Sequence, residues 1–291
     1  MSKPERILKK MIERIEECSQ SWVMPWHQND FSMPISIKGH QYQGLNLIWL
    51  WMCKDMQGYS SNQWGTYQQW KAIGGNLGGQ SASAFDQYIL QPKLIKDDDD
   101  NRFLKGFKTW AVFNRDQVKG LSNIESNQPF QTMYSINPDK RHAVQTYISS
   151  TKAVIIHKEN KAYYRPSQDL INMPDVSKFK DELFYYSTLF HELSHWTGAK
   201  NRLNRNFSRK RKDYAFEELI AEMTSAFLSS QLGIASQPTE DCITYMKSWI
   251  SAMKEQPKIL WDAITHAKDS MNYCNNLQQI KGCLIRCINA V

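Results

Sequence analysis

The sequence has 291 residues, a length that suits two compact domains, each large enough to bury its own core. Hydrophobic residues make up 41% of the chain and charged residues 22%, and no apolar run reaches the ~18 residues of a membrane span, which excludes an integral membrane protein. The formal net charge of +7 allows a polyanionic partner such as nucleic acid.

The first residues form no signal peptide, because basic residues interrupt the apolar positions between Met1 and Glu17. The six cysteines show no CxxC spacing, and this suits reduced thiols. We therefore expect a cytoplasmic protein.

Apolar residues recur at helical spacing near the N-terminus and predict a helix over Pro4–Cys18. From Trp22 to about Leu121 the chain is rich in Trp, Tyr, Gln and Gly, with short apolar runs between turn signals, and this pattern indicates mixed α and β structure. It predicts helices at Asn46–Lys54 and Gln63–Lys71 and a strand at Trp110–Phe113.

A polar segment with little periodicity follows, from Leu121 to about Thr146, and we place the domain boundary inside it near residue 140. Two β-prone runs, Lys152–His157 and Lys161–Arg165, then predict a hairpin. Beyond them the periodicity predicts helices at Lys178–Trp196, Asp213–Leu232, Asp241–Lys254 and Pro257–Asn289. The predicted fold is α+β, with a mixed first domain over residues 1–140 and a mostly helical second domain with a small β-sheet over residues 141–291.

A metal-binding motif lies on the first long helix of the second half. His191 and His195 are four residues apart, so both imidazoles face the same side of a helix and can bind one zinc ion. Glu192 is rotated away from that face toward the open coordination position, where it can take a proton from a bound water whose pKa zinc lowers to about 7. The alternative is a helix on which two histidines hydrogen-bond in the core.

The next predicted helix offers a third ligand. Glu218 and Glu222 lie four residues apart among apolar neighbours, where a pair of carboxylates is costly unless a metal or a histidine satisfies it. We expect Glu218 to be the third ligand and Glu222 to accept a hydrogen bond from one of the histidines, although the order could be reversed. Glu217 is one position off this face and is interpreted as a surface charge or a salt-bridge partner.

Between the two helices the chain is strongly basic. The run has two interpretations, a phosphate-binding surface and a solvated loop, and both require exposed cations. The cations are Lys200, Arg202, Arg205, Arg209, Lys210, Arg211 and Lys212.

With these motifs in view, the chain resembles the ArdC-type antirestriction proteins over almost its whole length. The resemblance implies an N-terminal domain that binds single-stranded DNA and a C-terminal zincin-like metallopeptidase domain. It is carried by Pro25-Trp26, Tyr42 to Asn46, Trp64 to Trp70, Val112 to Leu121, Tyr164 to Pro166, Asp169 to Pro174, His191 to Gly198, Arg202-Leu203 and Tyr214 to Glu222.

The resemblance also implies where DNA binds. Trp64, Tyr67 and Trp70 could stack unpaired bases, although aromatic residues at this spacing also suit a protein core. Single-stranded DNA is the expected partner, with duplex DNA as a second one, and the peptide substrate is unknown.

Two functions of different class follow. In the first, a mobile-element protein binds single-stranded DNA and hydrolyses peptides with one Zn²⁺ per chain, Mn²⁺ or another divalent ion being the alternative. In the second, the protein is a non-catalytic coat that protects DNA, and its metal site is structural.

Overall fold

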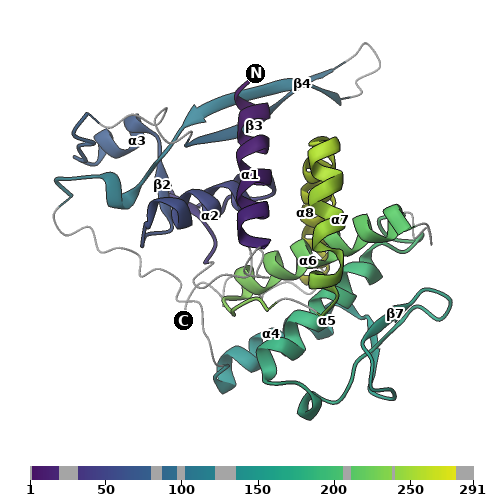
Figure 1. Cartoon of the computed structure of the whole chain (residues 1–291). Helices are drawn as coiled ribbons and strands as arrows, with labels where there is room; N and C mark the ends of the chain where they lie inside the picture. The colour runs from purple at the N-terminus through teal and green to yellow at the C-terminus, as the bar shows by residue number, and fades with distance from the viewer. Residues whose placement is uncertain are drawn as a thin grey trace. The chain divides into compact units, whose positions relative to one another are not determined.

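The computed structural model describes residues 2–19, 32–79, 87–96, 102–121, 136–205, 211–237 and 240–279. The chain divides into two compact units, residues 1–14 with 33–130 and residues 15–32 with 131–291. Helices are combined with small sheets in both units, so the predicted α+β fold is confirmed (Figure 1). Helix α1 (Lys3–Ser19), which the sequence predicts, contributes residues to each unit.

The first unit contains a three-stranded sheet of β1 (Ile35–Ser36), β2 (Gln63–Gly65) and β5 (Phe113–Asn114). Strand β2 lies in the centre, parallel to β1 and antiparallel to β5. Helix α2 (Leu45–Gln57) extends the predicted one, and the 3-10 turn η3 (Arg115–Gln117) follows β5.

Helix α3 (Tyr67–Ala72) begins four residues later than predicted. Thr66 stops it from starting earlier, because its hydroxyl accepts a hydrogen bond from the Gln69 N–H while the Gln69 side chain accepts one from the Thr66 N–H. The preceding residues are extended and form β2.

Trp64 and Trp70 lie in the core of the first unit, 0% and 1% exposed. The Trp70 indole N–H donates to the Phe113 carbonyl oxygen, and a Cβ at Gly65 would lie 2.9 Å from that indole nitrogen, so only glycine fits there. The prediction that both tryptophans stack on bases is therefore wrong: they pack in the core instead. Tyr67, at 49%, stays exposed.

A long two-stranded ribbon completes the first unit. Strands β3 (Tyr88–Lys96) and β4 (Arg102–Ala111) are antiparallel, with a shift of register after Lys93 (Figure 1). The Asn46 side chain holds the base of the ribbon, because it accepts from the Leu90 N–H at 2.8 Å and donates to the Leu90 carbonyl at 2.9 Å. The predicted strand Trp110–Phe113 is divided between β4 and β5.

The second unit opens with helix α4 (Pro138–Thr151), which the polar sequence does not predict, and with a sheet of β6 (Val154–Ile156), β7 (Tyr163–Arg165) and β8 (Leu170–Asn172). The predicted hairpin is wrong, because β8 lies between β6 and β7. The buried Asn172 amide explains this order: it bonds the backbone of Lys158, Glu159 and Lys161, and so ties the connection between β6 and β7 to β8.

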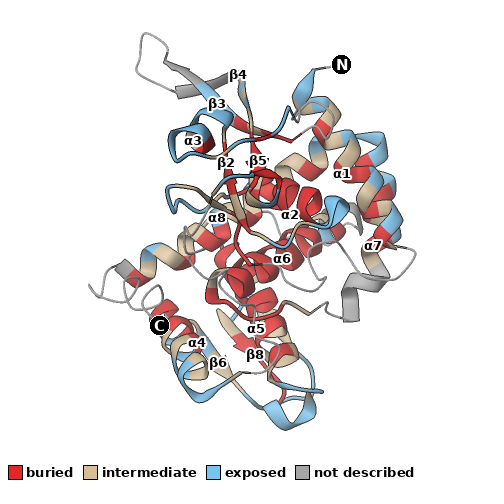
Figure 2. Ribbon diagram, turned by 90° about the vertical axis from the view of Figure 1, so that its left-hand side faces the viewer, coloured by how far each residue is buried: buried red, intermediate tan, exposed pale blue. Residues whose placement is uncertain are grey.

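Four helices follow, α5 (Glu182–Thr197), α6 (Arg211–Leu232), α7 (Glu240–Glu255) and α8 (Lys258–Gln279). Helix α5 begins at Glu182 and not at Lys178, because the Asp181 carboxylate accepts from the Phe184 N–H and caps it, while residues 176–178 form the turn η4 (Val176–Lys178). Figure 2 shows α5 and α6 buried along most of their length. The predicted continuation of the last helix beyond residue 279 falls outside the described residues.

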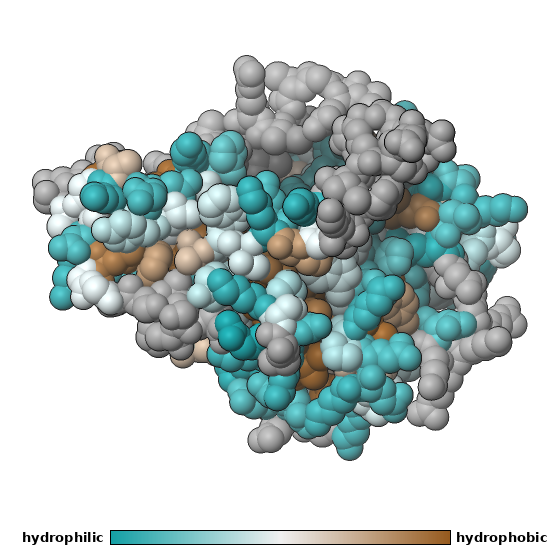
Figure 3. All heavy atoms as spheres, turned by 90° about the horizontal axis from the view of Figure 1, so that it is seen from above, coloured by the Kyte–Doolittle hydropathy of each residue, from teal (hydrophilic) through white to brown (hydrophobic). Residues whose placement is uncertain are grey.

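Among the described helices, none is long and apolar enough to cross a bilayer. On the face drawn in Figure 3, the coloured residues are mostly hydrophilic and the hydrophobic ones form small separate groups.

Candidate metal centre

Three side chains from α5 and α6 converge on one point. The Nε2 atoms of His191 and His195 lie 3.1 Å apart, and the Glu218 carboxylate lies 3.2 Å from the first and 3.5 Å from the second. Ligands at about 2.0–2.1 Å from a tetrahedral ion lie about 3.3–3.4 Å from one another. The three groups therefore stand at the separations that a shared ion of zinc size requires.

Small polar side chains hold the two helices in this register. The Ser194 hydroxyl on α5 donates to the Thr224 hydroxyl on α6 at 3.0 Å, and the Ser225 hydroxyl donates to the Ser187 carbonyl at 2.8 Å. All four residues are buried, so these bonds form away from water. The ligand set is thus built on the packed interface between α5 and α6.

Glu222 faces the other nitrogen of His191, with its Oε1 atom 3.3 Å from Nδ1. Burial lowers the pKa of His191, but the nearby carboxylates of Glu218 and Glu222 outweigh burial and hold that pKa well above its ordinary value of 6.5. The negative charge of the two carboxylates therefore favours a positive charge close to His191. A divalent cation supplies that charge, which is the chemical reason why this donor set fits a metal.

Glu192 lies beside the ligands and is 8% exposed. Burial raises its pKa, while the two histidines and a hydrogen bond from the backbone N–H of Tyr164 act in the opposite direction. A carboxylate with a raised pKa, next to a metal site, suits a general base that works near neutral pH.

The backbone of β7 therefore approaches the site. Residues of an antiparallel pair alternate between those that exchange hydrogen bonds with the partner strand and those that face away. Tyr164 faces away from β8, because its N–H bonds Glu192. Strand β7 is also at the edge of its described sheet, and the Tyr164 N–H on that edge is bonded to Glu192.

A further carboxylate, that of Glu217, orients His195. The sequence predicts that Glu217 is a surface charge or a salt-bridge partner, and only the salt bridge is found. Its Oε1 atom lies 3.2 Å from His195 Nδ1 and accepts from Arg205 at 2.7 Å. Burial raises the pKa of Glu217, but the bonds with His195 and Arg205 outweigh burial and hold it below its ordinary value. Glu217 is 5% exposed and is not a surface charge.

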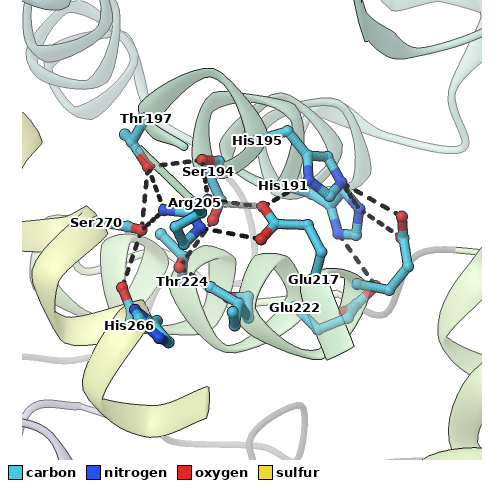
Figure 4. Close-up of polar contacts among 12 residues, drawn as sticks. His191, Ser194, His195, Thr197, Arg205, Glu217, Glu222, Thr224, His266 and Ser270 are labelled. Carbon is cyan, nitrogen blue, oxygen red and sulfur yellow. Dashed lines mark hydrogen bonds and ion pairs between the residues drawn. The ribbon is translucent and has the colours of Figure 1, made fainter. Parts of the chain in front are cut away.

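Arg205 lies behind this carboxylate with every N–H donor bonded (Figure 4). Nε and one terminal nitrogen bind Glu217, and that nitrogen also donates to the Ser194 carbonyl. The other terminal nitrogen donates to the hydroxyls of Thr197 and Ser270. Arg205 therefore connects α5, α6 and α8 beneath the metal ligands.

The basic run is thus only partly solvated. Arg205 is 9% exposed, and the Arg202 side chain, 5% exposed, pairs with Asp169. The prediction that these two contact phosphate is wrong, because both charges are used inside the second unit. Lys200 is exposed, Arg209 and Lys210 lie outside the described residues, and Arg211 and Lys212 begin α6.

Three tyrosines surround the site. The Tyr163 hydroxyl bonds Glu159, and the Tyr164 hydroxyl donates to Asp169, so neither is directed by these bonds toward the ligands. The Tyr214 hydroxyl, on the first turns of α6, donates to Glu218. Tyr214 is 44% exposed and is the phenol that contacts the ligand set directly.

Comparisons with known proteins agree with this division of the chain. Residues 2–120 match the N-terminal domain of anti-restriction factor ArdC, and residues 142–266 match the zincin-like metallopeptidase family. Two crystal structures of the antirestriction protein ArdC from plasmid R388 are 30% identical to this chain and each covers 94% of it. This chain covers 96% of the metal-free structure and superposes on it with a TM-score of 0.75. It covers 97% of the Mn(II)-bound structure, with a TM-score of 0.77.

Two curated proteins are also similar. An uncharacterized protein of Sinorhizobium fredii, y4eC, is 28% identical over 94% of this chain and 92% of its own length. The DNA primase TraC of Escherichia coli is 29% identical over 94% of this chain, which spans only 27% of that protein.

Proposed function

This chain belongs to the ArdC antirestriction family and has a zincin-like domain with a divalent-metal site, and on that premise we propose that it is a zinc-dependent metallopeptidase that also binds single-stranded DNA. The observation that carries the proposal is the tetrahedral spacing of His191, His195 and Glu218 with Glu192 beside them.

Each residue of the site has a distinct part in peptide hydrolysis. A divalent ion bound by the three ligands supplies Lewis-acid chemistry and lowers the pKa of a water molecule to about 7. The Glu192 carboxylate accepts the proton of the attacking water and passes it to the leaving amine. Glu217 and Glu222 keep His195 and His191 in the tautomer that presents Nε2 to the ion.

The place of β7 at the edge of its described sheet, with its backbone beside Glu192, supports a peptide as the substrate. An extended segment could lie along that edge, which would bring its scissile carbonyl next to Glu192. The Tyr214 hydroxyl is placed to donate to the developing oxyanion, because it already points toward Glu218.

The metal site is tested by the metal content of purified protein. We expect the wild-type chain to retain about one divalent ion, zinc in the first place, and His191→Ala to lose most of it because two protein ligands remain. Metal analysis after gel filtration measures this. His157→Ala is the matched control, since His157 is exposed and, within the described part of the chain, contacts the hydroxyl and ring of Tyr185 and not the ligand set. Equal metal in all three proteins would contradict the assignment.

DNA binding is tested by gel-shift titration with a single strand and with the matching duplex at two salt concentrations. We expect the single strand to bind more tightly and both complexes to weaken as salt rises, because phosphate contacts release counterions. The absence of any shift at low salt would refute this half of the proposal without affecting the peptidase half.

A further inference from the structure

One face of the β3–β4 ribbon has no role in the proposal above. Alternate residues of the ribbon point to opposite faces. Tyr88 and Leu90 are 8% and 4% exposed and form its buried face, while Gln91 and Lys93 are exposed on the other. The pairing of Gln91 with Lys108 and of Ile89 with Trp110 places Lys108 and Trp110 on that same exposed face.

Trp110 is 44% exposed, although it is the largest side chain on this face. Its indole N–H donates to the Gln91 side-chain oxygen on the neighbouring strand at 3.0 Å, and the Lys108 ammonium lies 5.4 Å from its ring centroid. A single exposed aromatic residue is common on protein surfaces. This one differs because its ring is fixed in orientation and flanked by a cation.

The charged residues of the two ribbon strands are all basic. The two strands carry Lys93, Lys96, Arg102, Lys105 and Lys108 and no acidic residue. The sequence between the two strands holds four aspartates, residues 97–100, which lie outside the described residues.

We propose that the ribbon face, defined by Gln91, Lys93, Lys108 and Trp110, binds single-stranded nucleic acid. An unpaired base stacks on the Trp110 ring, and Lys93 and Lys108 contact the phosphates beside it. A duplex does not offer a free base face to a surface aromatic, so the geometry favours a single strand. The inference rests on the proposed DNA binding and assigns it to a surface other than the one expected from the sequence.

Fluorescence anisotropy with labelled oligothymidylate and the full chain tests this assignment. We expect Trp110→Ala to weaken binding about 5- to 160-fold, the equivalent of about 1–3 kcal/mol per stacked base, with an unchanged salt dependence. Trp110→Phe should recover most of the affinity. Replacing both Lys93 and Lys108 with Gln should lower the slope of log affinity against log salt by about 1.4, at ~0.7 for each phosphate contact.

Two comparisons make the result specific. Ile73→Ala removes an apolar side chain of similar exposure, 41%, from the same unit and should leave affinity unchanged. Tyr67→Ala removes the exposed aromatic that the sequence favours, and should cost less than Trp110→Ala. Thermal unfolding of each variant checks that the fold is retained.

Several outcomes would overturn the assignment. Affinity of Trp110→Ala within twofold of the wild type would remove the ribbon face while leaving DNA binding in place. A larger loss in Tyr67→Ala would move the site to α3. Equal competition by duplex DNA or by polyglutamate would show a different occupant, and a wild-type chain that binds no strand would refute both this inference and the DNA-binding function.

Discussion

Replacing Glu192 with Gln should lower peptide hydrolysis by about 10²- to 10⁴-fold, the usual contribution of a general base. Gln keeps the size of the side chain and can still accept from the Tyr164 N–H, but it cannot take a proton from water. The ligands are unchanged, so metal content should equal that of the wild type. Turnover of a peptide library, followed by mass spectrometry and related to metal content, measures the effect.

The same variant separates the two functions considered for this chain. If the protein only coats DNA and the metal is structural, Glu192→Gln should protect DNA from restriction as well as the wild type does. His191→Ala serves as the companion variant, because it should lose both metal and turnover. Unchanged turnover in a Glu192→Gln protein that still holds its metal would eliminate the peptidase.

Replacing Arg205 with Met should lower the free energy of unfolding by about 3–5 kcal/mol, which is typical when one partner of a buried ion pair is removed. Met has a similar length and no charge, so Glu217 would remain buried without its main partner. The hydroxyls of Thr197 and Ser270 and the Ser194 carbonyl would each lose a donor. Denaturant unfolding at neutral pH measures the change.

The double variant Arg205→Met with Glu217→Gln is the control. It removes both charges, so it should be more stable than Arg205→Met alone. If the two single changes simply add, the ion pair is not the cause of the loss.

The pKa of Glu217 in the folded chain is below its ordinary 4.5. Its stabilising effect is therefore present above pH 4.5 and is lost as pH falls through the lowered pKa, so wild type and Arg205→Met should converge in acid.

The metal ligands could be predicted because their chemistry is encoded in local spacing. Residues four apart on a helix share a face, so His191 with His195 and Glu218 with Glu222 are visible in the sequence. The contact between the two helices belongs to the tertiary structure and is not encoded in local spacing. Carboxylates among apolar neighbours still indicate that contact, because buried carboxylates need a partner. Here the structure brings His191, His195 and Glu218 together, with Glu222 at the second nitrogen of His191.

The pair Arg205–Glu217 could not be predicted in the same way. Arg205 belongs to a run that looks solvated, and it is buried only because the backbone after Gly198 turns back, so that the Arg205 N–H donates to the Gly198 carbonyl. A signal did exist for Glu217. Helix α6 has apolar or small residues on every side, a pattern typical of a fully buried helix, so any carboxylate on it needs a partner.

In the first unit, the sequence pattern does not predict the β3–β4 ribbon. Pro92 lies within β3 and Gly106 within β4, and both residues argue against a long strand when only the sequence is read. The structure accommodates them in a pair that shifts register at Lys93. Trp64 and Trp70, which suit DNA by sequence, are in the core, whereas Tyr67 is exposed, and so is Trp110, for which the sequence predicts only a strand.

The contacts of Arg202 have a consequence for how a substrate could be accommodated. Its guanidinium lies 4.0 Å from the Trp196 ring centroid on α5, binds Asp169 before β8, and donates to the Tyr164 hydroxyl on β7. Helix α5 and strand β7 are thereby joined, so the position of β7 beside Glu192 is already set during folding. If an extended peptide lies along β7, as we propose, little conformational entropy of the protein would be lost when it binds.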